Sequence, residues 1–153
     1  MKKKLLMGIV LLLSVFVVAG CSFTKDAKTT EEFTKIASKE GLIVGDVKES
    51  QFSEYEQIKE ANVASSTDGW QLEFYVLDTV DHAKSMYNKN FNTFDKQPSK
   101  KKSQMEVGNY NRFTHETDET FVLLSRVDNT FLYVEVPMSN KQAAVKIIEE
   151  LGY

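Results

Sequence analysis

Residues 121–136 constrain the fold more than any other stretch of this sequence. Two runs of mostly apolar residues, Phe121–Val127 and Thr130–Val136, flank the dipeptide Asp128-Asn129. Asp and Asn tolerate the positive φ that a two-residue hairpin loop needs, so we expect an antiparallel hairpin in which Leu123 faces Val134. Ser125 then faces Leu132. One face of this hairpin carries Phe121, Leu123, Val127, Leu132, Val134 and Val136, and the other carries Val122, Leu124, Arg126, Phe131, Tyr133 and Glu135.

Further strands are expected upstream of this hairpin. Residues 70–76 (WQLEFYV) alternate large apolar with mostly polar side chains, which predicts a strand with one buried face and Trp70 at its head. Turn residues 66–69 precede it, so residues 58–65 are its expected hairpin partner. Residues 109–115 and, more weakly, 42–47 also have strand patterns.

Three helices are expected from apolar periodicity and end signals. The first spans residues 30–40, where Thr29 and Glu32 have the spacing of a capping box. The second spans residues 79–94, with Asp78 as its expected cap. The third spans residues 140–151, with Ser139 and Gln142 as a second box and Gly152 as its stop.

These elements predict an α+β fold, an antiparallel sheet with about three helices packed on one face, as a single domain over residues 30–153. A hairpin followed by a helix occurs twice, offset by 61 residues, so that Trp70 maps onto Phe131. The repeat is either an internal ββα duplication or the recurrence of a common motif.

The second face of the hairpin is a candidate binding surface, because three helices on the first face would leave it open. An exposed apolar patch on a sheet marks a site for a partner. The alternative is that the first helix or the loop through residues 48–57 covers it. The candidate residues are Phe131, Tyr133, Leu124 and Val122.

The N-terminal residues have the layout of an export signal. Lys2, Lys3 and Lys4 precede an uncharged run from Leu5 to Val18, which is too short for a stable transmembrane helix. Small residues then lead to Cys21, the single cysteine of the chain, in the sequence Val18-Ala19-Gly20-Cys21.

This stretch resembles the lipobox of bacterial lipoprotein precursors, although Val18 stands where leucine is commonest. The resemblance covers residues 1–21 and implies that the Cys21 thiol receives a diacylglyceryl group before cleavage between Gly20 and Cys21. It implies a signal peptide at 1–20, a lipidated tether at 21–29, and a domain anchored on the extracytoplasmic face of the cell membrane. Two acyl chains, such as palmitate, anchor a protein stably. The wider pattern is similar to small Gram-positive lipoproteins without an assigned activity.

Charge and cysteine content exclude several classes of protein. Cleavage removes three lysines and no acids, which leaves 16 basic against 22 acidic side chains, a net charge near −6. Nucleic-acid binding requires a basic surface, so no nucleic-acid partner is expected. After lipidation of Cys21 no free thiol remains for a disulfide or a thiolate metal site.

Catalytic signals are weak throughout the chain. His82 follows Asp78 and Asp81, which indicates either a metal or acid–base site or simple helix-start electrostatics. His115 lies beside acids, where a weak cation site or a solvated turn is expected. The basic segment 96–102 (KQPSKKK) either contacts anionic lipid or wall polymer or is a solvated connection.

We therefore expect a non-catalytic binding or scaffolding lipoprotein, without cofactor, metal or catalytic residues. Its expected partners are membrane lipid, through diacylglyceryl-Cys21, and an unidentified protein or cell-wall component. The alternative is a hydrolase or metal-dependent enzyme of unrecognised type, which would place convergent polar groups in a pocket.

Overall fold

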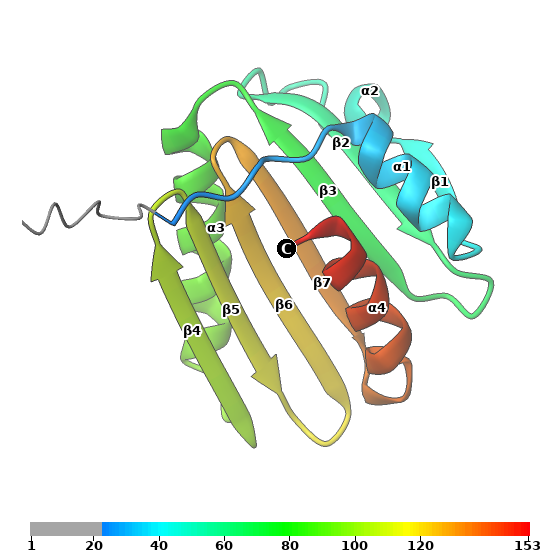
Figure 1. Ribbon diagram of the computed structural model, residues 1–153, viewed down its shortest axis with the longest axis vertical. Coiled ribbons are helices and arrows are strands. Elements are labelled where there is room, and N and C mark those ends of the chain that lie inside the picture. Colours follow the sequence, from blue (N-terminus) through cyan, green and yellow to red (C-terminus); the bar gives the residue numbers. More distant parts are fainter. Residues whose placement is uncertain (1–22) are drawn as a thin grey trace, which may run out of the picture.

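The computed structural model describes residues 23–153. The expected signal peptide, the cleavage site after Gly20 and the lipid acceptor Cys21 lie outside the described residues. Within these residues the chain forms one seven-stranded antiparallel sheet and four α-helices, which confirms the α+β class (Figure 1).

The strand order across the sheet is β1-β2-β3-β7-β6-β5-β4. The strands are β1 Ile43–Asp46, β2 Ile58–Ser65, β3 Gln71–Leu77, β4 Lys101–Val107, β5 Tyr110–Glu116, β6 Thr120–Val127 and β7 Thr130–Pro137. The helices are α1 Thr30–Lys39, α2 Lys48–Gln51, α3 Val80–Asp95 and α4 Lys141–Leu151, with a 3₁₀ turn at Met138–Asn140.

The hairpin predicted from residues 121–136 forms in the expected register. Leu123 pairs with Val134, Ser125 pairs with Leu132, and Asp128 takes a positive φ of 48° in the loop. The strands predicted over residues 42–47, 58–65, 70–76 and 109–115 are also present as β1, β2, β3 and β5.

Helices α1 and α4 lie side by side on one face of the sheet, which we call the helix-pair face (Figure 1). Their apolar stripes pack on Leu72, Phe74, Leu123, Leu132 and Val134. Salt bridges of 2.5 Å join the two helices, from Lys39 to Glu150 and from Lys146 to Glu40. Trp70, 7% exposed, belongs to this core, as the alternation in residues 70–76 predicted.

Helix α3 packs on the opposite face, which we call the single-helix face, so the expectation of all helices on one face is wrong (Figure 1). Strands β3 and β4 run parallel to each other at some distance, and α3 connects them across this face. Such crossovers are right-handed in nearly all proteins, and this one is too, which determines the face that α3 must cover.

The placement of α3 also argues against the internal duplication. The hairpin–helix unit does recur, as β2-β3-α3 and β6-β7-α4, but the two helices lie on opposite faces. Trp70 points to the helix-pair face, whereas Phe131, its counterpart at an offset of 61, points to α3. Recurrence of a common motif is the interpretation that fits this geometry.

The helix caps are only partly as predicted. Thr29 and Glu32 form the expected capping box, and Gly152 ends α4 with a φ of 81°. The cap of α3 is Thr79 rather than Asp78, because the Thr79 hydroxyl accepts the His82 N–H. No Ser139–Gln142 box forms, since the 3₁₀ turn makes Asn140 the N-cap of α4.

Candidate functional site

A groove runs along the single-helix face between α3 and the segment that links α2 to β2, and we call it the α3 groove. It has a volume of about 730 Å³ and continues over β3 into a hollow of about 310 Å³. Pockets of this size hold small ligands or a few side chains. The side chains that line it are Phe52, Tyr55, Gln57, Ile58, Glu73, Tyr75, Leu77, His82, Ser85, Met86, Lys89, Asn90, Phe131 and Tyr133.

Aromatic side chains form the walls of the groove, where the segment that follows α2 faces α3 across β3. Phe52 stands edge-on to Tyr75, with ring centroids 5.5 Å apart, and Tyr75 stacks on Phe131 at 6.2 Å. Met86, half-buried on α3, closes the other side. Rigid aromatic rings and a flexible thioether together make an adaptable apolar contact surface.

Two tyrosine–glutamate pairs lie at the floor of the groove, which Glu73, Tyr75 and Tyr133 line and which Glu135 borders through its bond to Tyr133. The Tyr75 hydroxyl donates to the Glu73 carboxylate and the Tyr133 hydroxyl donates to Glu135, each at 2.5 Å. Glu73 and Tyr133 are direct cross-strand partners, so the two pairs are neighbours. Burial first, and then the adjacent carboxylate, raises the pKa of both tyrosines, which keeps both hydroxyls protonated as donors.

The floor carries negative charge without an internal counter-charge. Among residues 23–153, no lysine or arginine lies within salt-bridge distance of Glu73 or Glu135. Glu73 is half-buried and accepts from Tyr75 and from the Gln71 amide, while Glu135 is exposed. A cation brought by a ligand would find two oriented carboxylates beside aromatic rings.

His82 and Asp78 stand at the mouth of the groove, at the start of α3. The His82 Nδ1 lies 2.5 Å from the Asp78 Oδ1, and this hydrogen bond lowers the pKa of Asp78. Ser85, one turn along α3, lines the same groove. Within residues 23–153, no three His, Cys, Asp or Glu side chains are grouped as a metal site would require.

The predicted binding surface is only partly accessible. Val122 and Leu124 are buried beneath α3, which overturns their assignment as an open patch. Phe131 is also buried, yet its ring borders the groove, and Tyr133 is half-buried in the groove floor. The apolar walls that Phe52 and Met86 form do not follow from the sequence, because the pattern does not show which face of the sheet α3 covers.

His115 and the basic segment also differ from expectation. His115 is 2% exposed, and it lies on β5 beside Phe94 and Phe113 rather than in a solvated turn. Lys100 pairs with Asp118 and Lys102 with Asp95, so two of the four lysines in residues 96–102 have an acidic partner.

The N-terminal segment 23–29 is docked across the end of the sheet rather than extended into solvent (Figure 1). The Lys25 N–H donates to the Asn109 Oδ1 at 2.9 Å, and the Asn109 amide donates back to the Lys25 carbonyl at 2.8 Å. The Lys25 ammonium lies 4.0 Å from the Tyr110 ring centroid. Gly108 makes room for this arrangement, because a Cβ there would lie 2.2 Å from the Phe23 carbonyl oxygen.

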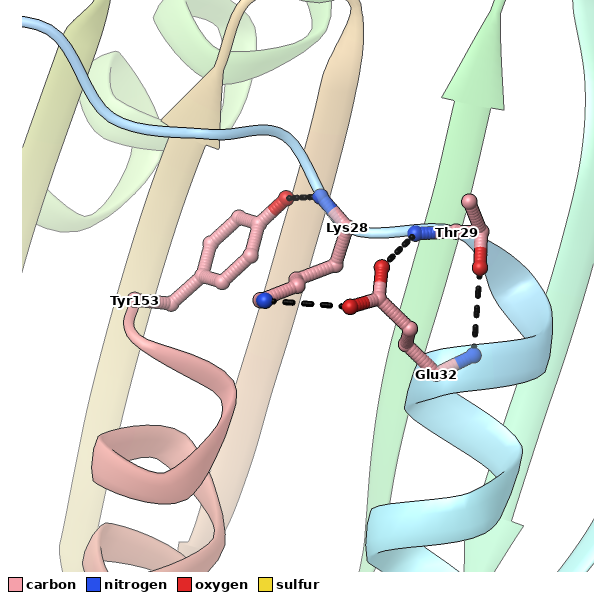
Figure 2. A network of polar contacts seen from close by, with 4 residues as sticks. All are labelled: Lys28, Thr29, Glu32 and Tyr153. Carbon is pink, nitrogen blue, oxygen red and sulfur yellow. Dashed lines mark hydrogen bonds and ion pairs between the residues drawn. The ribbon is translucent and has the colours of Figure 1, made fainter.

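Figure 2 shows how the docked segment connects to the helix-pair face. The Lys28 N–H donates to the Tyr153 hydroxyl at 3.4 Å, and the Lys28 ammonium pairs with Glu32 at 3.1 Å. Glu32 also accepts from the Thr29 N–H, which lowers the pKa of the Glu32 carboxyl. The last residue of the chain and the first turn of α1 therefore hold the segment from two sides.

Comparison with protein-family models, with curated proteins and with solved structures gives no match for this chain. In the described part of the chain, none of the helices combines the length and the apolar character that a membrane crossing requires.

Proposed function

We propose that this protein is a lipoprotein, anchored through diacylglyceryl-Cys21 on the extracytoplasmic face of the cell membrane, whose domain binds another protein in the α3 groove. The anchoring part of the proposal rests on the sequence from Lys2 to Cys21, where a basic start, a short apolar run and the lipobox-like VAGC follow in order. The binding part rests on the α3 groove.

The observation that carries the binding role is the combination of aromatic walls with uncompensated carboxylates. Phe52, Tyr75 and Met86 offer apolar contact, and Glu73 and Glu135 have no cationic partner among residues 23–153. The complementary ligand is a protein segment in which a lysine or arginine lies next to apolar side chains. Its cation would sit between the two glutamates, and its apolar neighbours would contact Tyr75 and Met86.

A crosslinking experiment tests this role. A photoreactive residue at Asn90, in the groove, should capture a partner in intact membranes, whereas one at Glu149, exposed on the far side of α4, should not. Capture at Asn90 should fall when Glu73 and Glu135 are both changed to Gln, because the charge is lost while shape is kept. Equal capture from both positions, or capture unaffected by E73Q/E135Q, would remove the groove from the proposal.

The anchoring role has its own test. Cys21→Ala should abolish incorporation of a fatty-acid analogue and leave the precursor uncut after Gly20, because the thiol is the acceptor. A Cys21→Ala protein that is labelled as strongly as the unchanged protein would exclude lipid attachment at this residue.

A hydrolase is the second candidate, and one observation favours it: Asp78, His82 and Ser85 lie together at the mouth of the groove. An acid–base–hydroxyl set of this kind is the pattern of nucleophilic catalysis. No hydrogen bond joins His82 to Ser85 in the structure, and all three residues are exposed, which favours the binding role. Hydrolysis of activated esters that disappears in both His82→Ala and Ser85→Ala would reverse this preference.

A further inference from the structure

The docked segment limits how far the domain can move from a lipid on Cys21. Cys21 is two residues before Phe23, and two residues of fully extended chain span at most about 7 Å. Phe23 itself is held at the β4–β5 turn, with its ring centroid 6.5 Å from that of Tyr110. Any acyl chains on Cys21 therefore start beside this corner of the sheet.

Exposed apolar side chains gather at the same corner. Phe23, Met105 and Val107, which we call the anchor tip, are 49%, 50% and 40% exposed. Val107 is the cross-strand partner of Tyr110, on which Phe23 packs, and Met105 follows two residues earlier on the same face of β4. Among the described residues only six large apolar side chains are exposed, so half of them lie in this one place.

Of the charged groups around the anchor tip, Arg112 is the cross-strand partner of Met105 and shares its face of the sheet. Glu106 points to the other face of β4, and Asp128 accepts a hydrogen bond from the Asn109 amide. Asp26 is exposed on the docked segment, and the Lys25 ammonium donates to the Gly152 carbonyl at 2.6 Å. A cation and aromatic rings next to aliphatic side chains are the composition of a surface that rests in a lipid headgroup region.

A second copy of the chain is a poor occupant for this edge. Antiparallel pairing of two β4 strands would turn one copy upside down and place its Phe23 at the far end, away from a shared bilayer.

We propose that the anchor tip enters the headgroup region of the same bilayer that holds the lipid on Cys21, so that the domain has one fixed orientation. This inference rests on the proposed lipidation. The strand β4 runs away from the tip for seven residues, about 20 Å, to Lys101. The basic segment 96–102 thus points away from the bilayer.

The experiment uses the mature lipidated protein in vesicles of phosphatidylcholine and phosphatidylglycerol. Because Cys21 is the only cysteine and its thiol carries the lipid, a fluorophore reacts only with an introduced cysteine, either Val107→Cys or Ser99→Cys. Lipids with a nitroxide at the headgroup should quench the label at position 107 several-fold more than the label at position 99. Equal quenching at both positions, or none at 107, overturns the inference.

Substitutions in the anchor tip, with a control on the opposite edge strand, test which side chains enter the headgroup region. Phe23→Ser and Met105→Ser should each lower quenching at position 107, whereas Ile43→Ser, which removes the 71% exposed Ile43 from the opposite edge strand, should leave it unchanged. Mass spectrometry of the same samples separates the two proposals. A protein without lipid overturns both the anchoring and the orientation, while a lipidated protein without quenching at 107 overturns the orientation alone.

Discussion

On the helix-pair face the buried polar residues of the described chain are Ser125 and Thr130, both small hydroxyls that donate to backbone carbonyls. On the single-helix face they are Asn111, His115 and Arg126. Arg126 is 1% exposed, and it donates to the Asn111 side chain at 2.6 Å and to the Asp128 carbonyl at 2.9 Å. The core under the helix pair thus contains only small hydroxyl residues among its buried polar groups, whereas the core under α3 contains long polar side chains.

The number of covering helices explains much of this difference. Seven strands about 4.8 Å apart make a sheet roughly 29 Å wide, and one helix with its side chains covers only about 10 Å. The pair α1 and α4 therefore covers most of its face, while α3 alone covers a narrower part of the other face, and the α3 groove lies between α3 and the segment that follows α2. The helix-pair face has a smaller open margin of about 400 Å³ over β4 and β5, lined by polar groups such as Arg112 and Thr114.

The largest loss of stability is expected in the core of the helix-pair face. Trp70→Ala should lower the free energy of unfolding by about 3–5 kcal/mol, because a large side chain is removed from a site with little room to collapse. Urea unfolding measures this loss. The control Ile43→Ala, at a 71% exposed position, should change stability by under about 0.5 kcal/mol.

A loss of about 3 kcal/mol is expected for Leu124→Ala on the single-helix face. Leu124 is 0% exposed under α3, so its removal leaves a cavity. The same urea experiment should show a smaller loss for Met86→Ala, because Met86 borders the open groove. If Leu124→Ala left the free energy of unfolding unchanged, Leu124 would not be buried under α3.

Sequence patterns predict elements well where one side of the element is buried. The register of β6 and β7 follows from the Asp128-Asn129 loop and the alternation around it. Strand β4 was missed because it is an edge strand whose seven residues are all exposed, so no alternation marks it. Edge strands of this kind commonly carry lysines, as Lys101 and Lys102 do here.

The missing strand also explains the error in helix placement. A periodic stripe shows that α3 buries one side but not which face of the sheet it covers. With β4 known to be parallel to β3, the right-handed crossover would have placed α3 correctly. The α3 groove depends on that placement, so of its lining residues the sequence indicated only His82, Phe131 and Tyr133 as candidates.

A moderate loss of stability is expected where the N-terminal segment crosses the end of the helix-pair face. Gly108→Ala should cost about 1–3 kcal/mol, because Gly108 has a φ of 58° and a Cβ would lie 2.2 Å from the Phe23 carbonyl oxygen. Limited proteolysis should then cut within residues 23–29. The control Gly45→Ala, with open space around the added methyl, should leave the segment protected.

The smallest effect is expected at His115, which tests whether the polar groups of the single-helix face contribute to its stability. Both ring nitrogens are buried and have no hydrogen-bond partner among residues 23–153. The imidazole lies between Phe94 and Phe113, with centroid distances of 6.1 and 6.4 Å.

His115→Phe should therefore be neutral or stabilise the domain by up to about 1 kcal/mol, because an aromatic ring of similar shape replaces a group whose polar atoms lose their hydration on folding. His115→Asn, which keeps a polar group and removes ring contacts, should destabilise it. Urea unfolding of both variants is the measurement. A loss above about 2 kcal/mol for His115→Phe would mean that the imidazole has a partner, and the single-helix face would then hold a satisfied polar network extending from Arg126 to His115.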